Sequence, residues 1–147
     1  MKNNNKGFSL VELIVVIAIM AVLVGVLAPS LLRYVEKTRI QKDASAIAEV
    51  CEAIKISAAE ESIYNELNAA TAAERTVLVT KSSGAISSTK LPNLAADLSK
   101  TIGTITFSGK DAADVTITIV VDANGAITCN CAGGGSNDWS TAITKVH

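Results

Sequence analysis

Aromatic side chains and histidine are scarce in this 147-residue chain. Phenylalanine, tyrosine and tryptophan together make up 3% of it, and the single histidine is the last residue, His147. An aromatic-walled pocket, or a nucleophile activated by a histidine base, therefore has almost nothing to be built from. The formal net charge of −1 gives no bias toward nucleic acid. We expect a protein that is not an enzyme and that needs no cofactor.

Charge is missing from one long stretch of the chain. Between Leu13 and Ala28 there is no charged residue and no polar side chain, and the wider apolar segment covers residues 8–32. As a helix this segment would be roughly 37 Å long, which is enough to cross a bilayer core of about 30 Å. The sequence therefore predicts a hydrophobic transmembrane helix over residues 8–32, after a short basic segment at residues 1–7.

One carboxylate, Glu12, interrupts this apolar segment. A charge at the centre of a membrane helix costs roughly 2.5–3.5 kcal/mol, and less near its end. A secretory signal peptide has no use for Glu12, and Pro29 would follow its only suitable cleavage point. A plain single-pass anchor would be oriented by flanking positive charge, but Lys2 and Lys6 are balanced by basic residues on the other side.

The heptapeptide KGFSLVE at residues 6–12, followed by the apolar run, resembles the class III signal of type IV prepilins and their pseudopilin relatives. The resemblance extends over about residues 6–43. It implies that a prepilin peptidase cuts between Gly7 and Phe8 and methylates the new amino group of Phe8. In a filament, it implies that Glu12 of one subunit pairs with the Phe8 amine of a neighbour.

Pairing would also explain Glu12 physically. A carboxylate in an apolar medium is costly unless it is paired, so it favours the one axial register that supplies a partner. We interpret Glu12 as an assembly device; the alternative is a glutamate that reaches the lipid headgroups. The partners that the resemblance implies are copies of the chain itself, the membrane, a prepilin peptidase, a pilus assembly ATPase and a platform protein.

Gly25 and Pro29 predict a helix break toward the end of the apolar segment. Pro29 has no backbone donor, and its ring clashes with the carbonyl of Gly25. Glycine weakens the same turn by about 0.5–1 kcal/mol relative to alanine. The result would be either a static kink or, as the resemblance implies, a segment that loses helical bonds when the subunit enters a filament.

Residues 33–67 contain no glycine or proline and predict an amphipathic continuation of the helix. Apolar residues recur every three or four positions, which places them on one face. They are Ile40, Ala44, Ile47, Cys51, Ile54 and Ala58. We expect a nearly continuous helix from about Phe8 to Leu67, whose apolar face needs a globular partner.

Residues 68–147 predict a small C-terminal β-rich globular region, so the expected fold class is α+β and type IV pilin-like. Strands are expected at residues 76–81, 85–88, 104–108, 114–122 and 126–131, and a short helix at residues 91–102. The strands would form a small antiparallel sheet that packs against the second half of the long helix. The tail over residues 136–147 fits either a helix or a final strand.

Three cysteines leave at least one thiol without an intrachain partner. Cys129 and Cys131 alternate on a predicted strand and share one face, and Cys51 lies on the apolar face of the helix. Three states stay open: a disulfide from Cys51 to Cys129 or Cys131, buried thiols, or a zinc site completed by His147. The spacing is not that of a standard zinc finger or ribbon, so we expect no metal.

The sequence therefore predicts the structural subunit of a type IV pilus-like filament, processed after Gly7 and polymerised through its hydrophobic helix. The precursor would cross the inner or cytoplasmic membrane once, and the mature subunit would reach the cell surface with its C-terminal region outside. Two alternatives remain: a pseudopilin of a type II secretion or competence apparatus, and a monomeric membrane-anchored binding module. The sequence shows no basic surface with aromatic side chains and therefore does not predict nucleic-acid binding.

Overall fold

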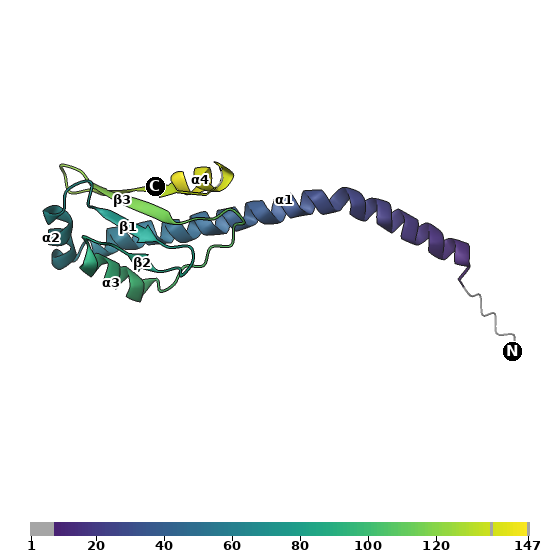
Figure 1. The fold of residues 1–147 in the computed structure, drawn as a ribbon, viewed down its shortest axis with the longest axis horizontal. Coiled ribbons are helices and arrows are strands. Elements are labelled where there is room, and N and C mark those ends of the chain that lie inside the picture. The colour runs from purple at the N-terminus through teal and green to yellow at the C-terminus, as the bar shows by residue number, and fades with distance from the viewer. Residues whose placement is uncertain (1–7, 136, 147) are drawn as a thin grey trace. The chain divides into compact units, whose positions relative to one another are not determined.

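The computed structural model describes residues 8–135 and 137–146, and the chain divides into two compact units, Met1–Val35 and Glu36–His147. The elements in chain order are α1 (Leu10–Ser57), α2 (Glu61–Ala69), β1 (Thr76–Val79), β2 (Ile86–Ser87), α3 (Pro92–Thr101), β3 (Val115–Val121), β4 (Ile127–Gly133) and α4 (Asn137–Thr144) (Figure 1). A long apolar N-terminal helix is thus followed by a small antiparallel sheet, which confirms the predicted α+β class.

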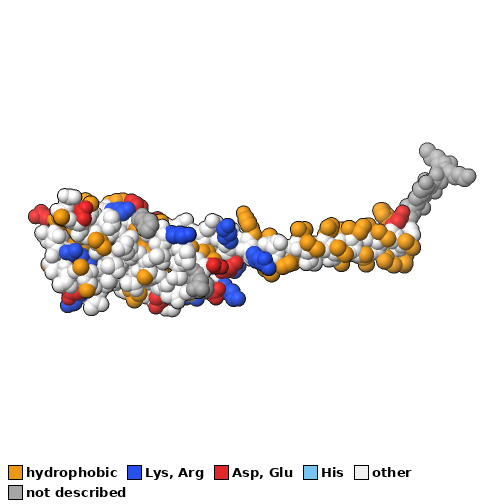
Figure 2. Space-filling view, turned by 90° about the horizontal axis from the view of Figure 1, so that it is seen from above, with side chains coloured by type: hydrophobic (Ala, Val, Ile, Leu, Met, Phe, Trp, Pro, Cys, Tyr) orange, Lys and Arg blue, Asp and Glu red, His pale blue; other side chains and the backbone are white. Residues whose placement is uncertain are grey.

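The described part of the first unit is an apolar helix whose side chains are exposed throughout. Every residue from Phe8 to Val35 is exposed, and hydrophobic side chains cover the apolar stretch (Figure 2). A single helix that is apolar all round cannot bury its own side chains. Because its backbone groups are paired within the helix, it can enter lipid or pack against other helices.

The second unit is built on one four-stranded sheet of order β2-β1-β3-β4, in which all neighbouring strands are antiparallel. Val77, Ile117 and Cys131 are paired in register across β1, β3 and β4, and all three side chains are buried. They belong to the same hydrophobic core as Ile47 and Ile54 of α1. The sheet therefore covers the helix, as predicted.

The predicted apolar face of α1 is confirmed in the second unit. Ile47, Cys51, Ile54 and Ala58 are buried, and Ile40 packs partly buried against the core. Since a four-stranded sheet this small needs a second layer for stability, packing on α1 is what holds the unit together.

The predicted end of the long helix at Leu67 was wrong, because α1 ends at Ser57 and α2 is a separate helix. The reason is the phase of the apolar residues. Ile54 and Ile63 are nine residues apart, about two and a half helical turns, so a straight helix would place them on opposite faces. The chain turns at residues 58–60, and Ile63 and Leu67 are then buried in the same core as Ile54.

The strand predicted at residues 104–108 was also wrong, since this segment has no regular secondary structure. Two of its backbone donors are bound outside the sheet. Ile105 donates to the carbonyl of Gly84 at 3.0 Å, and Ser108 donates to the Asp43 carboxylate at 2.7 Å. A segment whose N–H groups are already paired with a turn and a helix has no need of a neighbouring strand.

The tail that the sequence left open between helix and strand forms α4. Ser136 and His147, the first and last residues of that predicted tail, lie outside the described residues. Trp139 of α4 is fully buried and meets Phe107 edge-on, with ring centroids 5.7 Å apart. A helix this short is not stable by itself. Its packing on the core through the contact of Trp139 with Phe107 therefore stabilises α4.

Candidate functional site: the start of the apolar helix

Ser9 and Glu12 cap the first turn of α1 reciprocally. The backbone N–H of Ser9 donates to Glu12 Oε2 at 2.9 Å, and the Ser9 hydroxyl oxygen accepts from the N–H of Val11 at 3.3 Å. Serine followed three residues later by glutamate is the sequence pattern of a capping box. The carboxylate also lies at the helix N-terminus, where the macrodipole favours negative charge. Glu12 is therefore paired within its own chain before any neighbour is present.

The predicted cleavage point lies next to this cap. Phe8 precedes the capping residue, is not part of α1 and is 89% exposed. Gly7, the other side of the predicted scissile bond, and the basic segment 1–7 lie outside the described residues. Cutting before Phe8 would create a positive amine beside Ser9, within one helical turn of Glu12.

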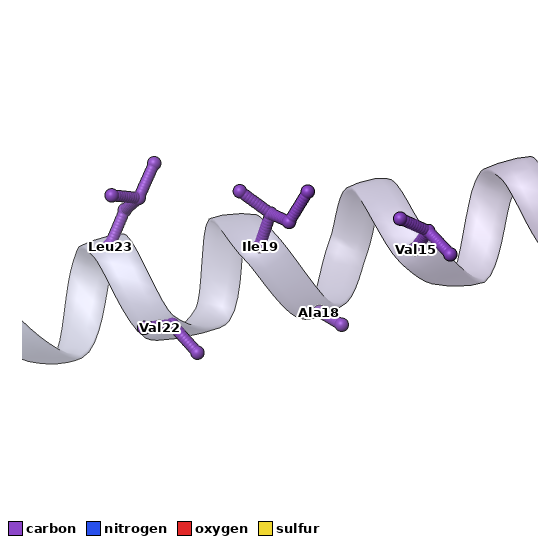
Figure 3. Close-up of a pocket in the computed structure, with 5 residues that line it drawn as sticks. All are labelled: Val15, Ala18, Ile19, Val22 and Leu23. Atoms are coloured by element: carbon purple, nitrogen blue, oxygen red, sulfur yellow. The ribbon is translucent and has the colours of Figure 1, made fainter.

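The exposed part of α1 has the length and composition of a membrane span. An 18-residue window has a mean hydropathy of 3.1, and none of it is buried. An open hollow follows one stretch of this helix (Figure 3); it is lined by Val15, Ala18, Ile19, Val22 and Leu23. All five side chains are carbon only, so the hollow offers nothing to orient a polar ligand and instead suits packing against another apolar surface.

The helix is continuous through Gly25 and Pro29. A methyl group added at Gly25 would meet no atom within 4 Å, so neighbours in the chain do not require glycine there. A helix break at this point is thus not seen in the single chain. Loss of helical bonds in a filament stays a prediction that rests on the missing donor of Pro29.

A second carboxylate, Asp43, is buried inside the globular unit. Asp43 is fully buried and accepts three hydrogen bonds: from the N–H of Ser108 at 2.7 Å, from that of Gly109 at 2.8 Å, and from Trp139 Nε1 at 3.0 Å. Glu36, two helical turns earlier, accepts from the N–H of Lys110 at 2.7 Å. Through these hydrogen bonds the two carboxylates hold the irregular loop at residues 108–110, and Trp139 of α4, against α1.

Sequence reasoning missed both polar arrangements. Asp43 lies between Ile40 and Ile47 at helical spacing, so a charged residue on the apolar face was the available signal. The Ser9–Glu12 spacing was likewise a readable capping signal. The donors to Asp43 are two backbone N–H groups and an indole N–H, none of which is a nucleophile.

The three predicted cysteines do meet, although they come from distant parts of the sequence. All three are buried, and Cys51 Sγ lies 3.4 Å from Cys131 Sγ. The Cys129 thiol points to the backbone carbonyl of Cys51 at 4.0 Å. Among residues 8–135 and 137–146, no group of three or more histidine, cysteine, aspartate or glutamate side chains could hold a metal ion. His147, the fourth candidate ligand, lies outside the described residues.

The protonation of these thiols follows from their contacts. A hydrogen bond with Cys129 lowers the pKa of Cys51, but the hydrogen bond with Cys131 and burial outweigh it and raise that pKa to about 12. The bond with Cys51, together with burial, raises the pKa of Cys129 well above its ordinary value. The hydrogen bond from Cys51 holds the pKa of Cys131 below the ordinary value. Cys51 and Cys129 therefore stay protonated at neutral pH.

Comparison with known proteins bears on the N-terminal site alone. Neither the curated proteins nor the solved structures gave a match. The family that matches is the prokaryotic N-terminal methylation motif, over residues 2–28, a stretch that contains Phe8, the Ser9–Glu12 cap and most of the apolar helix. The chain therefore carries the N-terminal signature of type IV prepilins, which supports a pilin-like or pseudopilin-like precursor in general terms, and its apolar helix fits a membrane anchor.

Proposed function

We propose that this chain is the structural subunit of a type IV pilus-like filament, cut between Gly7 and Phe8 and polymerised through its apolar helix. The observation that carries the proposal is the fully exposed apolar stretch of α1 with one carboxylate in its first turn. In the membrane, lipid covers this stretch; in a filament, copies of the same helix take over from lipid.

Glu12 then has two successive partners. In the precursor it accepts the N–H of Ser9. After cleavage, the new Phe8 amine of a neighbouring subunit supplies a full positive charge, so both members of the pair are then ionised. A single polar group inside an apolar interface can fix the register, because every other register leaves it unpaired.

Peptide mass spectrometry of the protein from its native cell envelope tests the processing step. A mature chain that begins with N-methylated Phe8 is the expected result, and a chain that begins at Met1 would contradict the proposal. The Glu12→Ala variant tests assembly: we expect processed protein that stays in the membrane fraction and is lost from sheared surface filaments. Normal filament yield from Glu12→Ala would contradict the assembly role of Glu12, whereas absence of the wild-type chain from sheared surface filaments would argue for a membrane-anchored module that works as a monomer.

A further inference from the structure

Among the three buried thiols, those of Cys51 and Cys131 lie within contact distance. Cys51 of α1 and Cys131 of β4 have their sulfur atoms 3.4 Å apart, and they are 80 residues apart in the sequence. A disulfide bond has an S–S length of about 2.05 Å, so the two sulfurs need to approach by little more than an ångström. Both side chains are at least 96% buried, since Cys51 is 1% and Cys131 is 4% exposed.

Cys129 is the less suitable partner. Its thiol also interacts with that of Cys51, but it is directed at the backbone carbonyl oxygen of Cys51, 4.0 Å away, an acceptor that only the protonated thiol can use. A bond between Cys129 and Cys131 is disfavoured by the strand itself. Alternate residues of an extended strand are about 6.6 Å apart, near the upper limit of Cα separations in disulfides. The two residues pair with Ile119 and Ile117 of β3, and that register would have to be distorted.

A structural zinc site would need a fourth ligand. Tetrahedral zinc takes four ligands, with Zn–S distances of about 2.3 Å. The buried core around the thiols is hydrophobic, and no suitable group of ligands occurs in the described part of the chain. Oxidation of the contacting pair needs no further residue.

We propose that Cys51 and Cys131 are joined by a disulfide that ties α1 to β4, and that Cys129 remains a buried thiol. The inference rests on the proposed function in one respect: it needs the globular unit to lie outside the cytoplasm, where disulfides persist. The crosslink would join the helix that carries the assembly segment to the last strand of the sheet.

The oxidant we name is an envelope thiol–disulfide oxidoreductase in its oxidised form. One cysteine of this chain, as thiolate, attacks the enzyme disulfide and forms a mixed disulfide; the second cysteine then displaces the enzyme sulfur. The chain loses two electrons and two protons, and the enzyme ends as a dithiol. Since both sulfurs are buried in the folded unit, the exchange takes place before β4 closes over α1.

Thiol counting on the full-length protein from its native envelope tests the proposal. Thiols are alkylated in denaturant without a reducing agent, and the protein is digested and mapped. We expect Cys129 alone to be alkylated and a peptide pair linked through Cys51 and Cys131. The Cys129→Ser variant is the matched control and should keep the linked pair, whereas Cys131→Ser should lose it.

Two results would overturn the inference: alkylation of all three cysteines, or a linked pair that contains Cys129. The same digest reports the N-terminal peptide, which keeps the two proposals separate. A chain that keeps Met1 but contains the Cys51–Cys131 bond removes the processed-filament proposal and supports this one. A chain that begins at methylated Phe8 but has three free thiols supports the processed-filament proposal and removes the disulfide proposal.

Discussion

At the scale of single residues, the chain provides N–H donors for a carboxylate on its exposed apolar helix and for one in its buried core. Glu12 has the N–H of Ser9 in the first turn of the apolar helix, and Asp43 has three donors in the core. A buried carboxylate that loses its donors costs more than an ordinary hydrogen bond. These two residues therefore fix local geometry: one sets where the helix starts, and the other sets where the irregular loop and α4 lie.

Replacing Asp43 by asparagine should destabilise the globular unit by about 2–3 kcal/mol. Both oxygens of Asp43 accept hydrogen bonds, whereas an asparagine would turn an NH2 group toward one of those donors. Urea unfolding in detergent, followed by the fluorescence of the single tryptophan, Trp139, measures the loss. Glu49→Gln, at an exposed position on the same helix, is the control and should change stability by less than about 0.5 kcal/mol. Equal effects of the two substitutions would contradict the role assigned to Asp43.

The thiols should make the reduced chain less stable at high pH. The folded-state pKa of Cys51 is raised from 9.0 to about 12, and that of Cys129 is also raised. Above pH 9 the unfolded chain therefore loses these protons while the folded chain keeps them, so unfolding becomes easier as pH rises. The slope should be about 1.4 kcal/mol per pH unit for each such thiol. The lowered pKa of Cys131 acts in the opposite direction only below pH 9 and adds no slope above it.

The measurement is the unfolding free energy of the reduced chain between pH 8 and pH 11, again from Trp139 emission. The Cys51→Ala/Cys129→Ala double variant lacks both raised groups and should show a much flatter dependence over the same range. A reduced chain whose stability does not fall above pH 9 would contradict the assigned protonation states.

At the scale of elements, the sequence predicted those segments whose pattern is complete within themselves. The apolar stretch of α1, the amphipathic stripe from Ile40 to Ala58, and the strands β3 and β4 each carry their own periodicity. For the turn after Ser57 the sequence held only a change of phase between Ile54 and Ile63, and the turn itself depends on Ile63 reaching a core made by distant strands. The irregular segment at residues 104–108 depends on acceptors at Gly84 and Asp43, which lie far away in the sequence.

The turn between β1 and β2 allows a test of how strongly the irregular segment at residues 104–108 depends on its acceptor at Gly84. Gly84 has φ +63°, donates to the carbonyl of Thr80 and accepts from the N–H of Ile105. A Cβ added there would collide with the Ile105 carbonyl, whereas one added at Gly103, with φ +77°, would meet nothing within 4 Å. A left-handed conformation alone costs an alanine about 1–2 kcal/mol.

Gly84→Ala should therefore cost clearly more than Gly103→Ala. We expect a loss of about 3 kcal/mol or more for the first variant and about 1 kcal/mol for the second, measured as unfolding free energies in urea. The comparison holds the backbone strain nearly constant and isolates the collision with residue Ile105. Similar losses at both positions would show that the loop moves aside at little cost.

At the scale of the whole molecule, the two units depend on different surroundings. The second unit buries its own core, with Ile47, Leu94 and Ile117 fully buried, whereas the first unit exposes every described side chain. Stability and assembly should therefore respond to different substitutions. Glu12 accepts its hydrogen bond from Ser9, which also lies in the first unit, and distant sites act independently of each other. A change at Glu12 should therefore leave the unfolding of the second unit unchanged.

The two tasks proposed for Glu12 can be separated by substitution. Glutamine at this position can still accept the N–H of Ser9, because glutamine also serves in a capping box, but it has no charge to pair with an amine. Glu12→Gln should therefore keep the precursor helix and its processing, and should lower the yield of sheared filaments at least about tenfold, which corresponds to roughly 1.4 kcal/mol per subunit contact.

Ser9→Ala makes the opposite change and is the matched control. It removes the hydroxyl acceptor for Val11 and costs about 1 kcal/mol of local helix stability, but it leaves the carboxylate in place. We expect filaments from Ser9→Ala close to the wild-type yield, and unchanged urea midpoints for the globular unit in both variants. If Glu12→Gln assembles normally while Ser9→Ala does not, the carboxylate acts through the helix cap, and the register of the filament must be set by the apolar packing alone.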